Sequence, residues 1–266
     1  HSRNHDAPMT GLPALRQVIA DKVHRFHGRS LDPDAEITVC TGATEGLFSA
    51  ITATVRPGDE VIVLDPAYDS YEPAVTLAGG LTRHVPLRIG SNGHDFHPDW
   101  QRIAETINPQ TRLLVLNFPH NPTGAILSSD DLDTLAGIVR DTDCLIVADE
   151  VYEHIVFDGR NHFSMAGDPE LRRRSFVVSS FGKTYHATGW KIGYCLAPAP
   201  LSAELRKVHQ YLTFASNTPI QMALADYLAR HADHLALSDF YQEKRDLFVS
   251  LLGPSRFRPL PCEGTY

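Results

Sequence analysis

The sequence lacks the features that mark several common classes of protein. No apolar run approaches the length of a membrane span, and no stretch has the pattern of a secretory signal. Internal repeats and low-complexity segments are absent too. Cysteine is scarce and no CxxC pair occurs, so we expect reduced, largely buried thiols in a cytoplasmic protein. The four cysteines are Cys40, Cys144, Cys195 and Cys262.

Signals for a nucleic-acid surface or a metal site are also missing. The formal net charge is −8 and no basic block stands out beyond residues 172–174, so we expect no nucleic-acid partner. Fourteen histidines include three HxxH pairs, but no third ligand of matching character accompanies them and no HExxH motif occurs. We therefore predict no metal site. The pairs are His24/His27, His94/His97 and His231/His234.

The stretch FVVSSFGKTYHATGWKIGY, residues 176–194, carries the most distinctive chemistry. Its first five residues have the pattern of a buried strand, and Gly182 then turns the chain into Lys183. A lysine at this place is either a surface charge or a desolvated amine, which loses its proton near neutral pH and attacks a carbonyl. The GKT triplet does not form a P-loop, because Val177 stands where that motif requires glycine.

Apolar, strand-like runs alternate with helical segments along most of the chain. The runs occupy residues 37–41, 60–64, 81–87, 111–117, 144–149 and 176–180, and helical spacing occurs near residues 10–26, 42–55, 71–79, 98–107 and 129–140. Residues 201–252 also look helical, with interruptions at 217–219 and near Ser238. This alternation predicts an α/β fold whose largely parallel central sheet is covered by helices on both faces.

Polar residues follow these apolar runs at the points where the strands end. Because ligands of open α/β sheets bind at the carboxyl edge of the strands, these side chains could form a single site. Each residue alone also has an ordinary structural explanation, such as a packed tyrosine or a common strand-to-helix turn. The residues are Thr44, Tyr68, Asn121, Asp149 and Lys183.

Five motifs in order, GATEGL, DPAYDSY, NFPHNPTG, DEVYEH and SSFGKTYHATGWKIGY, carry a family resemblance over nearly the whole chain. The chain resembles fold-type I pyridoxal-phosphate-dependent aminotransferases of class I/II, and is most similar to the methionine and kynurenine aminotransferase branch. The resemblance implies a three-layer α/β sandwich. It also implies that residues 1–240 form a large cofactor-binding domain and that residues 241–266 begin a small C-terminal domain, largely absent from this chain.

The resemblance assigns Lys183 as the catalytic residue, which holds pyridoxal 5′-phosphate as a Schiff base and shuttles a proton at the substrate α-carbon. Asp149 would pair with the pyridine nitrogen and keep it protonated, so that the ring accepts electrons. Asn121 and Tyr152 would hydrogen-bond the phenolic oxygen of the ring, and Tyr68 would stack on its face.

The cofactor phosphate would lie on Ala43 and Thr44, with Ser180 and Lys191 adding a hydroxyl and a cation. Many relatives carry arginine at position 191, so lysine gives a point charge in place of a bidentate fork. A second departure is Asp6, at the place where the family usually has a tyrosine that reaches the phosphate of the neighbouring subunit.

The activity implied is transfer of an amino group between an amino acid with a methionine, aromatic or similar apolar side chain and a 2-oxo acid. A cysteine-conjugate β-lyase and a non-catalytic pyridoxal-phosphate-binding module are the alternatives. The resemblance further implies a homodimer with shared sites, in which Phe214 reaches the neighbouring pocket. The family's arginine for the substrate α-carboxylate would lie past Tyr266.

Overall fold

A computed structural model describes residues 4–90, 95–231 and 233–266 of the chain. His94, a member of one HxxH pair, lies outside these residues. The part of the chain that the model describes contains no helix with the length and apolar character needed to cross a membrane.

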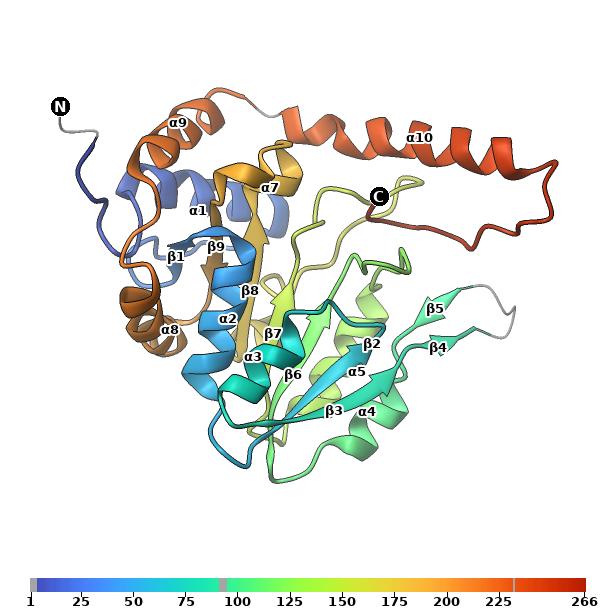
Figure 1. The fold of residues 1–266 in the computed structure, drawn as a ribbon, viewed down its shortest axis with the longest axis horizontal. Helices are drawn as coiled ribbons and strands as arrows, with labels where there is room; N and C mark the ends of the chain where they lie inside the picture. The colour runs from blue at the N-terminus through green and yellow to red at the C-terminus, as the bar shows by residue number, and fades with distance from the viewer. Residues whose placement is uncertain (1–3, 91–94, 232) are drawn as a thin grey trace.

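A central sheet runs through the middle of the molecule (Figure 1). Within the described residues its strand order is β1-β9-β8-β7-β6-β2-β3. Strand β9 pairs antiparallel with both β1 and β8, and all other neighbours pair parallel. A separate hairpin joins β4, Arg88–Ile89, to β5, Phe96–His97. The strands of the sheet are β1 Ile37–Cys40, β2 Glu60–Asp65, β3 Leu81–Pro86, β6 Thr111–Asn117, β7 Leu145–Asp149, β8 Ser175–Ser180 and β9 Gly193–Leu196.

Helices cover both faces of this sheet. In β2, Val61 and Val63 pack into one apolar core with α2, α3 and α8, whereas Ile62 and Leu64 pack into the other with α1, α4, α5 and α9. Successive residues of a strand point to opposite faces, so both faces of β2 are buried. The helices are α1 Pro13–His27, α2 Gly42–Thr54, α3 Tyr71–Leu77, α4 Trp100–Thr106, α5 Ser129–Val139, α6 Pro169–Arg172, α7 Phe181–Thr184, α8 Ala199–Leu212, α9 Thr218–Leu228 and α10 Leu237–Leu252, with short 3₁₀ turns η2 Thr188–Trp190 and η3 Asp233–Ala236.

The predicted three-layer α/β architecture with a mostly parallel sheet is therefore confirmed. Strand β9 was not predicted: its four residues begin with a glycine and run into Ala197 and Pro198, so they do not stand out as an apolar run from the loop around them. An interruption was predicted at residues 217–219. Asn217 does lie between α8 and α9, where its side chain caps α9 by accepting the backbone N–H of Ile220 at 3.1 Å, whereas residues 218 and 219 form the first turn of α9.

The C-terminal part of the chain lies away from the sheet. Helix α10 extends along one side of the molecule, and the segment after it returns towards the carboxyl edge of the strands (Figure 1). The predicted division between residues 240 and 241 falls inside α10, and it stays a prediction.

Candidate functional site

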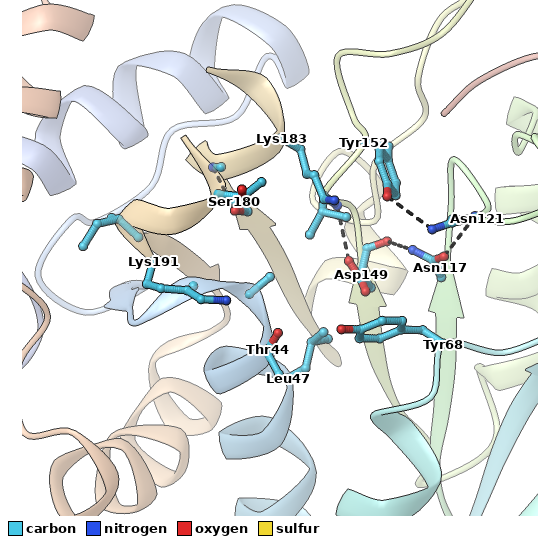
Figure 2. A pocket seen from close by; sticks show the side chains of 16 residues that line it. Thr44, Leu47, Tyr68, Asn117, Asn121, Asp149, Tyr152, Ser180, Lys183 and Lys191 are labelled. Atoms are coloured by element: carbon cyan, nitrogen blue, oxygen red, sulfur yellow. Dashed lines mark hydrogen bonds between the residues drawn. The ribbon is translucent and has the colours of Figure 1, made fainter. Parts of the chain in front are cut away.

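A cavity of about 230 Å³ lies at the carboxyl ends of the parallel strands, and the predicted site residues surround it (Figure 2). The parallel register brings the ends of β6, β7 and β8 to one edge, since Asn117 pairs with Asp149 and Asp149 with Val178. All nine residues singled out from the sequence line this cavity: Ala43, Thr44, Tyr68, Asn121, Asp149, Tyr152, Ser180, Lys183 and Lys191.

Asp149, the last residue of β7, is a buried carboxylate held by three neighbours. The Tyr71 hydroxyl donates to its Oδ2 at 2.7 Å, the backbone N–H of Val151 donates to Oδ1 at 3.3 Å, and the Asn117 amide donates to its backbone carbonyl at 3.1 Å. Burial raises the pKa of Asp149 to about 6, against the opposing effect of the Tyr71 hydrogen bond. The carboxylate is thus strongly oriented but poorly solvated, which favours a cationic partner in the cavity.

Lys183 enters the cavity from the short helix α7, which begins where β8 ends. The Ser180 side chain caps this helix by accepting the Gly182 N–H at 3.0 Å. The Lys183 ammonium donates to the Tyr266 hydroxyl at 2.6 Å and lies over the rings of Tyr152 and Tyr266, at 5.5 and 5.2 Å from their centroids.

The pKa of Lys183 is raised above its ordinary value. Burial lowers it, but the hydrogen bond to Tyr266 and the proximity of Tyr152 outweigh that effect. Of the two possibilities considered from the sequence, a charged or a neutral amine, the surroundings of Lys183 favour the charged one, because the side chain is only partly buried and two phenol groups face it.

Asn121 and Tyr152 form a hydrogen-bonding pair on the Asp149 side of the cavity (Figure 2). The Asn121 amide donates to the Tyr152 hydroxyl at 3.3 Å, and its backbone N–H donates to the Asn117 side chain at 3.2 Å. Burial raises the pKa of Tyr152, so the phenol keeps its proton. The two side chains present polar hydrogens to the same region.

The opposite end of the cavity is suited to an anion. Residues 42–44 form the first turn of α2, where backbone N–H groups have no partner within the helix and the helix dipole is positive. Ser180 and Lys191 reach this end from the other side of the cavity (Figure 2). Gly193 of β9 packs so closely here that a Cβ would lie 2.7 Å from the Ser179 carbonyl and 2.9 Å from the Ala43 nitrogen.

Tyr68 lies at the cavity, whereas Asp6 and Phe214 lie outside its lining. Tyr68 lines the cavity, is 44% exposed and makes an edge-on ring contact with Tyr71 at 5.7 Å. Asp6 is exposed and does not line the cavity. Phe214 is 49% exposed and also lies outside the lining.

The sequence reading left out several residues that shape the site. Asn117 ends the apolar run of β6 and could have been found by the same strand-end rule that selected Asp149. The position of Tyr71 at a strand end was visible in the sequence, but its hydrogen bond to Asp149, like that of Tyr266 to Lys183, joins distant segments whose pairing the sequence does not indicate. Other lining residues are Gly42, Leu47, Val151, Gly182, Thr188 and Ile192.

Comparison with known proteins finds close relatives along the whole chain. The family model described as "Aminotransferase class I and II" matches residues 1–266. A methionine aminotransferase of Escherichia coli K12 is 53% identical over 264 residues, which cover 99% of this chain and 67% of the relative. A kynurenine–oxoglutarate transaminase 1 of Mus musculus is 34% identical over 96% of this chain and 64% of the relative. The chain thus spans about two thirds of the length of the relatives it matches.

Solved structures agree with the fold. A methionine aminotransferase from Escherichia coli superposes with a TM-score of 0.96 at 52% identity, covering 99% of this chain and 69% of that one. An aromatic aminotransferase from Pyrococcus horikoshii superposes with a TM-score of 0.92 at 32% identity, covering 100% of this chain and 71% of that one.

Proposed function

The chain belongs to the aminotransferase class I and II family, and from that premise we propose that it binds pyridoxal phosphate and transfers an amino group between an amino acid and a 2-oxo acid. One observation carries the proposal: a lysine, a buried carboxylate and an anion-binding helix turn surround one cavity. The lysine suits the aldehyde of that cofactor, the carboxylate suits its pyridine nitrogen, and the helix turn suits its phosphate.

The donor set of the cavity fits the cofactor at both ends. Asp149 is buried with a raised pKa, so a protonated pyridine nitrogen would stabilise its charged form. The N–H groups of Ala43 and Thr44, with the Ser180 hydroxyl and the Lys191 ammonium, would hold a phosphate. Tyr68 would contact the face of the ring between these ends.

Different residues of the chain would bind the cofactor and transfer the proton. When bound, pyridoxal phosphate supplies an aldehyde carbon that joins amines and a ring that withdraws electrons from the substrate α-carbon. Lys183 would hold the cofactor covalently and, once released from it, move a proton at the α-carbon. Asn121 and Tyr152 would orient the phenolic oxygen, and Tyr266 would direct the Lys183 amine through their 2.6 Å hydrogen bond.

We propose methionine, aromatic and similar apolar amino acids as amino donors. Support comes from the two groups of relatives, one named for methionine at 53% identity and the other for kynurenine at 34%.

The test is a visible absorption spectrum of the purified chain with pyridoxal phosphate, before and after addition of methionine, followed by borohydride trapping and peptide mapping. We expect a Schiff-base absorption band that shifts with methionine and a trapped peptide containing Lys183. The Lys183→Ala variant should bind the cofactor only non-covalently and lose transamination, whereas Lys191→Ala should bind it more weakly but still trap at Lys183. A band that ignores every amino acid would contradict the transaminase assignment. Release of pyruvate, ammonia and a thiol from a cysteine S-conjugate, without any 2-oxo acid, would indicate a β-lyase.

We also propose a homodimer. Tyr211, Leu212 and Phe214 lie at and just after the end of α8 and are 86%, 47% and 49% exposed, an unusual exposure for large apolar side chains grouped together. Light scattering after size-exclusion chromatography tests this, and a monomer at micromolar concentration would contradict it.

A cytoplasmic location and a second domain complete the proposal. Cys40, Cys144 and Cys195 are buried free thiols, as suits a reducing compartment, and fractionation of the cells that make the protein would test the location. Residues 241–266 would begin a smaller domain, because Leu247 and Phe248 of α10 are 60% and 62% exposed rather than packed on the sheet. Limited proteolysis should then remove this part first.

A further inference from the structure

Glu45 and His209 form a hydrogen-bonded pair beside residues 42–44, the helix turn proposed to hold the phosphate. Glu45, in the first turn of α2, accepts the backbone N–H of Thr41 through Oε2 at 3.0 Å, so its carboxylate closes the turn that leads into residues 42–44. Its other oxygen accepts from Nδ1 of His209 at 3.0 Å, and His209, on α8, is completely buried. The cavity lining includes neither Glu45 nor His209.

Each ring nitrogen of His209 has a polar partner. Its Nε2 lies 3.0 Å from the backbone carbonyl of Met9, which only accepts, so Nε2 must carry a hydrogen. Nδ1 lies 3.0 Å from Oε1 of Glu45 and 3.3 Å from the Thr213 hydroxyl, which can donate or accept. A hydrogen on Nδ1 as well would make His209 a cation paired with the Glu45 carboxylate.

Glu45 is charged in this arrangement. Burial raises the pKa of Glu45, but the hydrogen bonds from His209, Ser49 and Thr41 outweigh it and leave the pKa below its ordinary value. A lone carboxylate in the first turn of α2 would repel a phosphate dianion bound at the same helix end. A hydrogen on both ring nitrogens of His209 would offset that repulsion.

A metal ion is a poor alternative occupant of this cluster. Cys40, Glu45 and His209 present ligand atoms within 4.8 Å of one another. However, both nitrogens of His209 already have protein partners, and burial raises the pKa of Cys40 well above its ordinary value, which keeps the thiol protonated. The cluster is better explained as an internal support.

We propose that Glu45 is a positioning residue for the phosphate end of the cofactor, and that His209 neutralises it so that the turn it holds can accept a dianion. The inference rests on the proposed function, because it concerns the same cofactor. It predicts a specific defect: loss of the Glu45 contact to Thr41, or of His209 beside a charged Glu45, weakens binding of pyridoxal phosphate but not of pyridoxal, which lacks the phosphate.

The experiment compares the dissociation constants of pyridoxal phosphate and pyridoxal, measured by absorbance titration of the cofactor-free chain. Glu45→Ala loses the hydrogen bond to Thr41, so it should weaken the binding of pyridoxal phosphate about tenfold. The dissociation constant of pyridoxal should change less than twofold. Glu45→Gln retains an oxygen for Thr41 and should stay near the wild type. Ser49→Ala, which removes a Glu45 contact that does not reach Thr41, is the matched control and should keep the wild-type ratio.

His209→Gln tests the charge. This variant leaves the Glu45 carboxylate without its histidine partner and should weaken the binding of pyridoxal phosphate about tenfold or more. In the double variant His209→Gln/Glu45→Gln, most of the affinity for pyridoxal phosphate should return. Thermal unfolding checks that each variant folds, and if His209→Gln does not fold, the two Glu45 variants decide the question alone.

Equal weakening of both ligands, or an unchanged ratio in Glu45→Ala, would overturn the inference and leave the pair a purely structural one. A wild-type chain that binds neither ligand would instead overturn the proposed function itself. The two failures are therefore distinguishable.

Discussion

The Tyr71 hydroxyl donates a 2.7 Å hydrogen bond to Oδ2 of Asp149, and both side chains are almost completely buried. Burial raises the pKa of Tyr71 well above its ordinary value, so the phenol acts as a donor over the whole accessible pH range. The pair fixes the direction of the carboxylate without supplying a positive charge. Lys183 lowers the pKa of Asp149 but burial outweighs it, so a further cation in the cavity would stabilise the carboxylate.

Replacing Asp149 with asparagine should make the cofactor-free chain more stable at alkaline pH. The pKa of Asp149 is about 6 in the folded chain and 3.8 in its ordinary state, so the folded state binds more protons between these values and stability falls as pH rises through that window. From pH 5 to pH 8 the wild type should lose about 1 kcal/mol relative to Asp149→Asn. Urea unfolding at both pH values measures the difference, and an equal change in the two proteins would contradict the raised pKa.

Tyr71→Phe should raise the pKa of Asp149. The hydrogen bond from Tyr71 lowers the pKa of Asp149, so its loss should move that pKa above 6 and extend the pH range over which the carboxyl is neutral. Carbon-13 NMR titration of the labelled carboxyl group measures the shift directly. A pKa that stays the same or falls would show that the hydrogen bond does not stabilise the anion.

Tyr266→Phe should lower the pKa of Lys183, because it removes the 2.6 Å hydrogen bond that helps to raise it and leaves burial, which acts the other way. The rate at which Lys183 is labelled by an amine-reactive reagent should then rise at lower pH than in the wild type. Tyr241→Phe provides a control, since Tyr241 stacks on Tyr266 but makes no hydrogen bond to Lys183 among those described. Identical pH profiles for Tyr266→Phe and the wild type would contradict this role.

Gly193→Ala should disturb the anion-binding turn. The added methyl would lie 2.7 Å from the Ser179 carbonyl and 2.9 Å from the Ala43 nitrogen, so strand β9 and α2 must separate. We expect a destabilisation of about 1–3 kcal/mol and weaker binding of pyridoxal phosphate. Gly189→Ala is the matched control, because no atom lies within 4 Å of the added methyl there. Equal melting temperatures of the two variants would contradict the prediction.

Lys22→Met should destabilise the chain strongly. Lys22 donates to Glu153 at 2.5 Å and to Tyr194 at 2.6 Å, and Glu153 is buried. Burial raises the pKa of Glu153, but Lys22 and its other partners hold it well below its ordinary value, so removal of Lys22 leaves an uncompensated charge and should cost about 3–5 kcal/mol.

The Lys22 effect should depend on pH and on Glu153. A lowered folded pKa contributes stability above the ordinary value of 4.5 and loses it as the pH falls towards the folded value, so the difference between wild type and Lys22→Met should narrow in acid. The double variant Lys22→Met/Glu153→Gln should recover most of the lost stability at neutral pH. If the double variant is no more stable than Lys22→Met, unpaired charge is not the cause.

The sequence was informative wherever a polar residue ended a long apolar run. Asp149 ends β7, Lys183 and Asn121 follow β8 and β6, and the parallel register of these strands brings the three residues together at one edge. The alternation of apolar runs and helices was likewise enough to predict the layers, because strands buried on both faces leave a strong signal.

Contacts between distant segments could not be predicted in the same way. The pairing of Glu45 with His209 joins α2 to α8, and that of Lys183 with Tyr266 joins α7 to the segment after α10. Each depends on a single hydrogen bond whose partner leaves no periodic pattern in the sequence. The direction of the Lys183 pKa could not be predicted for the same reason, since it depends on Tyr266.

Strand β9 also has a consequence for the order of folding. It lies between β1, which leads into the anion-binding turn, and β8, which leads into Lys183, and it alone is hydrogen-bonded to both. During synthesis β1 therefore has no neighbouring strand to hydrogen-bond with until residues 193–196 have left the ribosome. Contacts of such long sequence separation form slowly, so the two ends of the cavity would be assembled only in a late step of folding.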